Sequence, residues 1–137
     1  MARNLHKYED LTPHEFNLEK QRASIIYIAS GPMEYHEECN ALGIDPMKGY
    51  HWCLAAAEIT GGIVFPMLPI APSGSSPFSS REDLRKRIAK IKFGEYTAQP
   101  MLYPSIMTSN EICRGLYMEL LETFAEELKF KLCVFFG

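Results

Sequence analysis

Three short segments that are apolar at almost every position constrain the fold of this chain most strongly. They are Ile25 to Ser30 (IIYIAS), Ile63 to Leu68 (IVFPML) and Leu132 to Phe136 (LCVFF). A strand with one face in solvent alternates polar and apolar side chains, whereas a strand buried on both faces of a parallel sheet does not. The segments therefore predict parallel strands, the second being short or near an edge because Pro66 and Pro69 lack an amide donor.

Helix signals separate these strands. Thr12, Pro13 and Glu15 form a capping box with proline at the first helical position, which predicts a helix to about Gln21. A second helix is expected from Asp45-Pro46 to Gly61-Gly62. A third, capped by Thr108 with Glu111, carries an apolar residue at every fourth position: Ile112, Leu116, Leu120, Phe124 and Leu128. The order predicts an α/β domain with a largely parallel sheet flanked by helices in three layers.

Length and charge narrow the class of protein. A chain of 137 residues closes one core, so we interpret residues 1–137 as a single domain. A net charge of −3 gives no general attraction to phosphate, and we expect no nucleic-acid partner. No apolar run approaches the roughly 20 residues that span a bilayer and no secretory signal precedes the first helix, which predicts a cytoplasmic protein without a membrane partner. The four cysteines lack CxxC spacing, so we expect reduced thiols.

The segment directly after the first strand carries the candidate chemistry. Residues 31–45 read GPMEYHEECNALGID, and ligands of α/β proteins gather at the carboxyl ends of strands. Glu34 and His36 share one side of an extended chain, and the loop can bring Asp45 to join them. Carboxylate and imidazole groups bind Zn or Mn, so this pattern predicts a site for one or two divalent cations.

Each of these residues also has a simpler interpretation. Asp45 before Pro46 suits a helix cap, and a lone histidine such as His36 is often a surface residue or a hydrogen-bonded one. Cys39 is either a small core residue or a ligand, and the Glu37-Glu38 pair suits solvent. Residues 81–92 carry six basic side chains against two acidic ones, which fits a solvated helix face, a subunit contact or an anion site.

The metal segment resembles the creatininase (creatinine amidohydrolase-like) family, whose motif has a glycine, then E-x-H-G-x-H, then a leucine-containing loop that closes on an aspartate. The matching positions are Gly31, Glu34, His36, Leu42, Gly43 and Asp45. The similarity continues through the loop Gly74-Ser75-Ser76 after the proline-rich strand, Tyr103-Pro104 before the third helix, and an apolar strand that ends in glycine. It covers essentially the whole chain.

This resemblance implies a metal-dependent hydrolase of carbon–nitrogen amide bonds in small or cyclic substrates, which acts as a homo-oligomer. Glu34 would bind one metal, His36 the other, and Asp45 would bridge them. The cofactors would be Zn and/or Mn, two per complete site, which together activate water. Ser75 and Ser76 are candidates to donate hydrogen bonds to the substrate.

The chain also departs from the family pattern. Glu37-Glu38-Cys39 stands where the family has Gly-x-His, and the basic segment 81–92 replaces a histidine-bearing segment. The family's remaining metal ligands follow the strand that matches Leu132 to Phe136. We therefore expect residues 1–137 to be the N-terminal part of a longer domain. The alternative is a non-catalytic or degenerate family member that acts as an oligomeric interaction module.

Overall fold

A small parallel sheet forms the centre of the molecule. The computed structural model describes residues 5–33, 40–71, 92–93, 96–97 and 109–137. Strand β1 (Ile25–Ala29) lies in the middle, between β2 (Ile63–Val64) and β5 (Leu132–Phe136), and both neighbours run parallel to it. The register pairs Ile26 with Ile63 on one side and with Cys133 on the other. The parallel sheet predicted from the apolar segments is confirmed.

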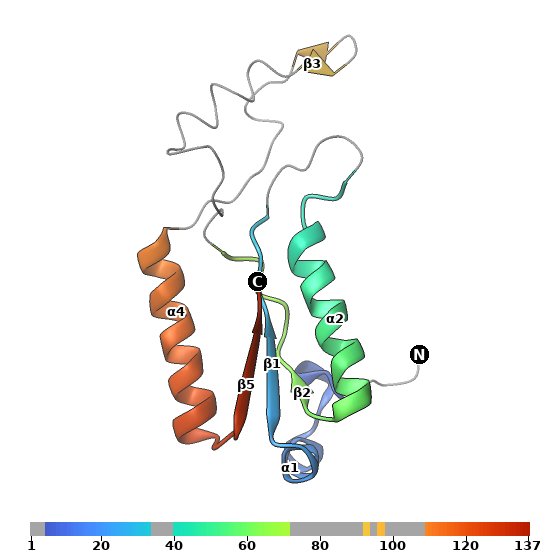
Figure 1. The fold of residues 1–137 in the computed structure, drawn as a ribbon, viewed down its shortest axis with the longest axis vertical. Coiled ribbons are helices and arrows are strands. Elements are labelled where there is room, and N and C mark those ends of the chain that lie inside the picture. Colours follow the sequence, from blue (N-terminus) through green and yellow to red (C-terminus); the bar gives the residue numbers. More distant parts are fainter. Residues whose placement is uncertain (1–4, 34–39, 72–91, 94–95, 98–108) are drawn as a thin grey trace.

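Helices cover both faces of this sheet (Figure 1). Helix α2 (Ile44–Thr60) packs Cys53, Leu54 and Ala57 against Tyr27 and Ala29 of β1. The opposite face, with Ile26 and Ile28, is covered mainly by α4 (Asn110–Glu122) and the π-helical turn η3 that follows it (Thr123–Glu127). The α/β class and the helical layer on each face follow from these contacts.

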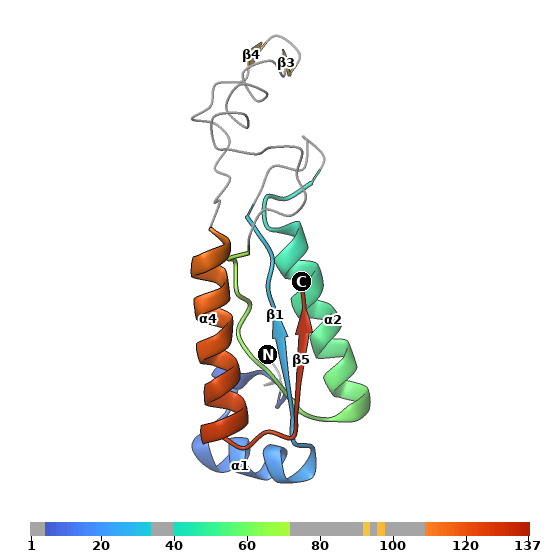
Figure 2. The same cartoon turned by 60° about the vertical axis from the view of Figure 1, so that its left-hand side comes forward.

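Helix α1 (Pro13–Arg22) lies across the amino ends of the strands (Figures 1 and 2). It begins at the predicted capping box, in which the Thr12 side chain accepts from the Glu15 amide and the Glu15 carboxylate accepts from the Thr12 amide. Lys20 of α1 donates to the carbonyl of Leu128, close to where the last helical turn ends. A short 3₁₀ turn, η1 (Tyr8–Asp10), precedes α1, and Tyr8 and Phe16 stack edge to face.

The second predicted strand is shorter than expected. Only Ile63–Val64 forms β2. The Phe65 amide still donates to the Tyr27 carbonyl, but the next donor to β1 is Leu68 instead of Met67, so the regular register is lost beyond Phe65. The chain still follows β1, because the Leu68 amide donates to the Ala29 carbonyl and the Gly31 amide to the Leu68 carbonyl. A separate antiparallel pair, β3 (Lys92–Phe93) with β4 (Tyr96–Thr97), stands outside this sheet.

Strand β5 has the predicted bounds but is not buried on both faces. Leu132 is 51% exposed and Phe135 is 39% exposed, because within the described residues β5 pairs with β1 alone. Helix α2 is also apolar on its outer side, where Trp52 is 63% exposed and Ile59 is 86% exposed. The Trp52 ring lies 5.5 Å from that of Phe136, so Trp52 adjoins the end of β5.

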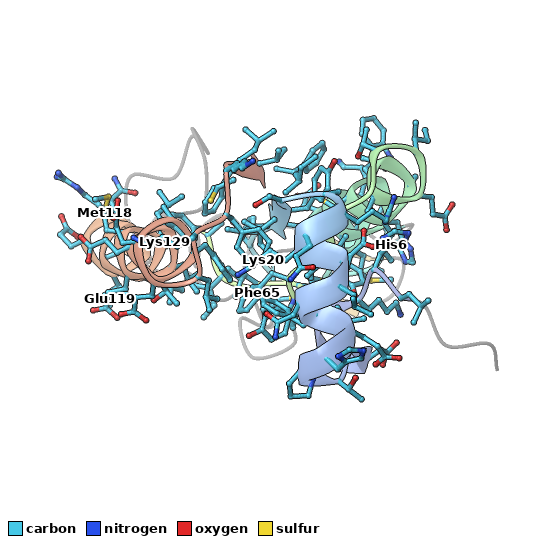
Figure 3. The ribbon with its side chains drawn as sticks, turned by 90° about the horizontal axis from the view of Figure 1, so that it is seen from below. His6, Lys20, Phe65, Met118, Glu119 and Lys129 are labelled. Carbon is cyan, nitrogen blue, oxygen red and sulfur yellow. The ribbon has the colours of Figure 1, made fainter. Side chains whose placement is uncertain are left out.

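Helix α4 differs from its predicted face. The N-cap is Ser109, whose side chain accepts from the Ile112 amide, and not Thr108, which lies outside the described residues. Ile112 is 64% exposed, whereas Phe124, three steps of four residues further on, is buried. Met118 and Glu119 project from the outer side of α4 (Figure 3).

Candidate functional site

The carboxyl ends of β1 and β5 meet where α2 and α4 both begin, at the upper edge of the sheet in Figures 1 and 2. In open parallel sheets this edge is where ligands bind. Ser30, the first residue after β1, is a buried polar residue at 5% exposure, and its amide donates to the Phe136 carbonyl. The edge is therefore the place to look for the predicted site.

Hydrogen bonds of two hydroxyl groups, those of Ser30 and Tyr117, join three segments of the chain at this edge. The Tyr117 hydroxyl, from α4, donates to the carbonyl of Ile70 across 2.9 Å. It lies 2.7 Å from Ser30 Oγ, and because its own hydrogen is used on Ile70 it accepts the hydrogen of Ser30. The Tyr117 ring also meets Phe135 of β5 edge to face, with centroids 5.4 Å apart. Sequence reasoning missed this network, since Ser30 and Tyr117 are 87 positions apart.

The loop after β1 is closed at its base. A Cβ atom on Gly31 would lie 2.7 Å from the nitrogen of Pro46, so the end of β1 packs directly on the Asp45-Pro46 peptide. Met33 reaches the other side of this base, where its Sδ would lie 3.0 Å from a Cβ on Gly43. The structure therefore brings Asp45 to the carboxyl edge of the sheet, beside the point where the chain leaves Met33 for Glu34.

Asp45 is not the helix cap that its place before Pro46 suggested. Helix α2 begins at Ile44 with Gly43 as N-cap, which puts Asp45 in the first turn. There an acidic side chain is stabilised by the helix dipole. The Asp45 side chain is 30% exposed, and its Oδ1 lies 3.1 Å from Lys48 Nζ. A partly exposed carboxylate of this kind is a group that can bind a cation.

The other predicted site residues cannot be placed. Glu34, His36, Ser75 and Ser76 lie outside the described residues, as do Glu37, Glu38 and Cys39. Of the basic segment 81–92 only Lys92 is described, and it belongs to strand β3. Within the described parts of the chain, no three His, Cys, Asp or Glu residues gather closely enough to hold a metal ion.

The amino edge of the sheet carries a polar cluster that the sequence analysis also missed. Glu19 of α1 accepts from the buried Gly62 amide at 2.8 Å and from two nitrogens of Arg22 at 2.6 and 2.7 Å. His6 Nδ1 lies 2.9 Å from the Gly62 carbonyl and 3.6 Å from Glu19 Oε1. Figure 3 views this edge and places His6 beside α1. The spacing of Glu19 and Arg22, three apart on a helix, was the available signal.

The pKa of Glu19 reflects this environment. Burial acts to raise the pKa of the carboxyl, but the hydrogen bonds from Arg22 and the Gly62 amide, with the charges of Arg22 and His6, hold it below its ordinary value. Glu19 is therefore ionised at neutral pH. It joins α1 to the turn between α2 and β2 as a structural group.

The described cysteines are core thiols. Cys53 and Cys113 are buried, Cys133 is partly buried, and none of these three forms a disulfide. Burial raises the pKa of all three thiols, which disfavours the reactive thiolate. The expectation of reduced thiols holds for these residues, and none of them suits a nucleophile.

Comparison with known proteins identifies no relative of this chain. No family model, curated protein or solved structure matches this chain. Among the described helices, none has the length and apolar character to cross a membrane.

Proposed function

We propose that this chain is a metal-dependent hydrolase of carbon–nitrogen amide bonds in small or cyclic substrates, similar to creatinine amidohydrolases. Glu34, His36 and Asp45 bind Zn and/or Mn, and Ser75 and Ser76 donate to the substrate. The observation that carries the proposal is the closed base of the loop, with Gly31 against Pro46 and Met33 beside Gly43. The two ends of the segment 31–45 therefore lie close together at the carboxyl edge of the sheet.

The donor set suits these metals. Two carboxylates and an imidazole offer the oxygen and nitrogen ligands that Zn and Mn accept. Asp45 supplies the part of this set that is described, and its 30% exposure leaves room for a ligand at the surface. The Lys48 ammonium group lies 3.1 Å from Asp45 Oδ1, and a cation bound at that oxygen would compete with it.

The chemistry divides between the metals and the chain. A bound pair of divalent cations would lower the pKa of a shared water and stabilise the negative charge that develops on the amide oxygen. The protein residues hold the ligands in place, and the serine hydroxyls of the following loop orient the substrate. The leaving nitrogen takes its proton from water or from a side chain of the site.

A second candidate function, a non-catalytic module that assembles with other copies, is favoured by the apolar surface beside β5. Trp52, Ile59 and Leu132 are each more than half exposed. Large exposed apolar side chains are typical of an interface where they gather on one surface, and Trp52 adjoins the Phe136 ring of β5. A homo-oligomer is compatible with both functions, and metal binding separates them.

Metal content tests the proposal. Purified protein is dialysed against Zn²⁺ or Mn²⁺, then against buffer, and metal per chain is measured with Asp45→Ala and with Glu58→Ala as a control. Glu58 is an exposed carboxylate at the other end of α2. We expect the parent and Glu58→Ala to retain metal and Asp45→Ala to lose it, with circular dichroism unchanged. No metal in the parent, or full metal in Asp45→Ala, would refute the proposal.

A further inference from the structure

The two edges of the parallel sheet differ in how the chain closes them. Beyond β2 the N-terminal segment forms a cover, because Lys7 makes a parallel bridge with Val64 and the Val64 amide donates to the His6 carbonyl. On the other side, β5 lies next to β1 (Figure 1), and among the described residues it pairs with no second strand. An edge strand of this kind is a template for pairing with another strand.

The backbone groups that β5 turns outward follow from the hydrogen bonds on its inner side. The Phe136 carbonyl accepts from the Ser30 amide, so Phe136 turns its backbone toward β1. Successive residues of a strand turn their amide and carbonyl groups to opposite sides. Val134 therefore also faces β1, whereas Cys133 and Phe135 face outward. The outer edge offers two amide donors and two carbonyl acceptors.

The side chains along this edge are apolar. The sequence of β5, LCVFF, has no charged residue and no proline, which are the residues that protect the edges of monomeric proteins from pairing. Leu132 is 51% exposed, Phe135 is 39% exposed, and the 63% exposed Trp52 lies beside the Phe136 ring. An extended apolar strand is the partner that fits both the backbone groups and the side chains.

The strand β5 is such a partner for itself. Antiparallel pairing about a two-fold axis at Val134 places Cys133 opposite Phe135 of the second copy, and Phe135 opposite Cys133. Residues directly opposite in an antiparallel pair exchange both hydrogen bonds when their backbone groups face each other. This register therefore forms four hydrogen bonds between the two β5 strands. A shift by one residue would place outward groups opposite inward ones and form none.

The same register covers the exposed apolar side chains. Val134 and Phe136 pack on the α2 side of the sheet, and Leu132 shares that side because side chains alternate along a strand. Leu132 would lie opposite Phe136 of the second copy, beside its Trp52. Phe135 would be covered on the other side of the sheet. One two-fold operation thus buries all of these side chains, and apolar pairs of this kind stabilise antiparallel strands.

We propose that β5 is a dimer interface, at which two copies of this chain join edge to edge into one six-stranded sheet with their β5 strands antiparallel about Val134. The edges at β2, covered by residues 6–7, lie at the two ends of this sheet, so assembly stops at two copies. The interface goes beyond the proposed function, since it needs neither a metal nor hydrolysis.

Sedimentation velocity on the purified chain over a wide range of concentration tests the dimer. We expect twice the chain mass of 15.6 kDa. Leu132→Lys puts a charge opposite Phe136 of the second copy, twice in each dimer, and should raise the dimer Kd at least about a hundredfold. The matched control is Leu18→Lys on α1, where the leucine is 53% exposed against 51% for Leu132. This control should keep the parent Kd.

A disulfide tests the register. Two residues opposite each other in a non-hydrogen-bonded antiparallel pair have Cα atoms about 4.5 Å apart, which is within disulfide reach. Oxidised Val134→Cys should therefore run as a covalent dimer on a non-reducing gel. In Leu132→Cys the two new thiols would lie four residues apart along the strands, too far to bond, so this variant and the parent should run as single chains.

The outcomes separate this interface from the proposed function. A monomer at every concentration, equal Kd values for the two lysine variants, or no covalent dimer of Val134→Cys would overturn the interface. A parent dimer with these properties that binds no metal would support the interface and refute the hydrolase. A monomer that binds metal would do the reverse.

Discussion

The two ends of the same three-stranded sheet are held by different chemistry. At the amino end, charged residues are used for structure: Glu19 joins Arg22, His6 and the Gly62 amide, and Lys20 binds the Leu128 carbonyl. At the carboxyl end the ties are neutral, through the Ser30 and Tyr117 hydroxyls and the backbone contact of Gly31 with Pro46. The described contacts at the amino end therefore use charged side chains to close the structure, whereas those named here at the carboxyl end use hydroxyl groups and backbone packing.

The largest effects are expected from one glycine-to-alanine change at each end. Gly61 has a φ of +78° and its Cβ would lie 2.7 Å from that of Ala23, so Gly61→Ala should cost about 3 kcal/mol of unfolding free energy. Gly31→Ala, with its Cβ 2.7 Å from the Pro46 nitrogen, should cost about 2 kcal/mol. Urea denaturation measures both values.

Metal binding distinguishes this pair of variants. Gly31→Ala displaces the Asp45-Pro46 peptide and should weaken metal binding, whereas folded Gly61→Ala should bind metal as the parent does. Equal metal affinity in the two variants, measured well below their unfolding temperatures, would contradict the division between the ends of the sheet.

An intermediate effect is expected from Glu19→Gln at the amino end. The amide still offers an acceptor to Gly62 but loses the charge that Arg22 and His6 face, so we expect a loss of about 1–2 kcal/mol at pH 7. Because the pKa of Glu19 is lowered in the folded protein, its contribution is complete above the unfolded value of about 4.3. It is lost as pH falls through the folded pKa.

The pH dependence provides the check. The difference in unfolding free energy between the parent and Glu19→Gln should persist from pH 7 to about pH 5 and shrink below about pH 4.3. A difference that grows below about pH 4.3 would show that the carboxylate is not stabilised by its neighbours. Metal content at neutral pH should be the same in both proteins.

The smallest effects are expected at the two helix caps. Thr12 at the amino end has a reciprocal capping box, whereas Ser109 of α4, near the carboxyl end, accepts from the Ile112 amide and donates to the Glu111 carboxylate without the reciprocal bond to its own amide. Thr12→Ala should cost about 1 kcal/mol and Ser109→Ala somewhat less. Thermal unfolding of the two variants ranks them, and a larger loss for Ser109→Ala would contradict the ranking.

Local signals in the sequence predicted the elements well. The capping box at Thr12 involves residues three apart, so it could be read directly, and the apolar segments gave the strands. The buried face of α4 could not be read from four-residue spacing. Each step of four residues turns about 40° beyond a full helical circle, which carries Ile112 away from the face that buries Phe124.

At the candidate site, the contacts that could not be predicted from the sequence are those between residues far apart in the chain. The motif around Asp45 was visible because its residues are close in sequence, and the structure adds that the ends of its loop meet. The Ser30–Tyr117 tie joins positions 87 apart and depends on how α4 docks. The exposure of Leu132 could not be predicted from the sequence either, since it depends on which strands pair with β5 and not on the apolar pattern.

The register of the central strand has a consequence for how the chain folds. Ile26 pairs with Ile63 within one local unit, but it pairs on its other side with Cys133, and Ser24 meets Lys131 across 107 positions. Closing the longer loop costs more chain entropy, and such contacts slow folding. The unit of β1, α2 and β2 should form first, so that arrival of β5 and α4 completes the carboxyl edge last. A nascent chain would then bury the Tyr27 and Ala29 face of its sheet under α2 first, and the Ile26 and Ile28 face only when α4 arrives with Tyr117.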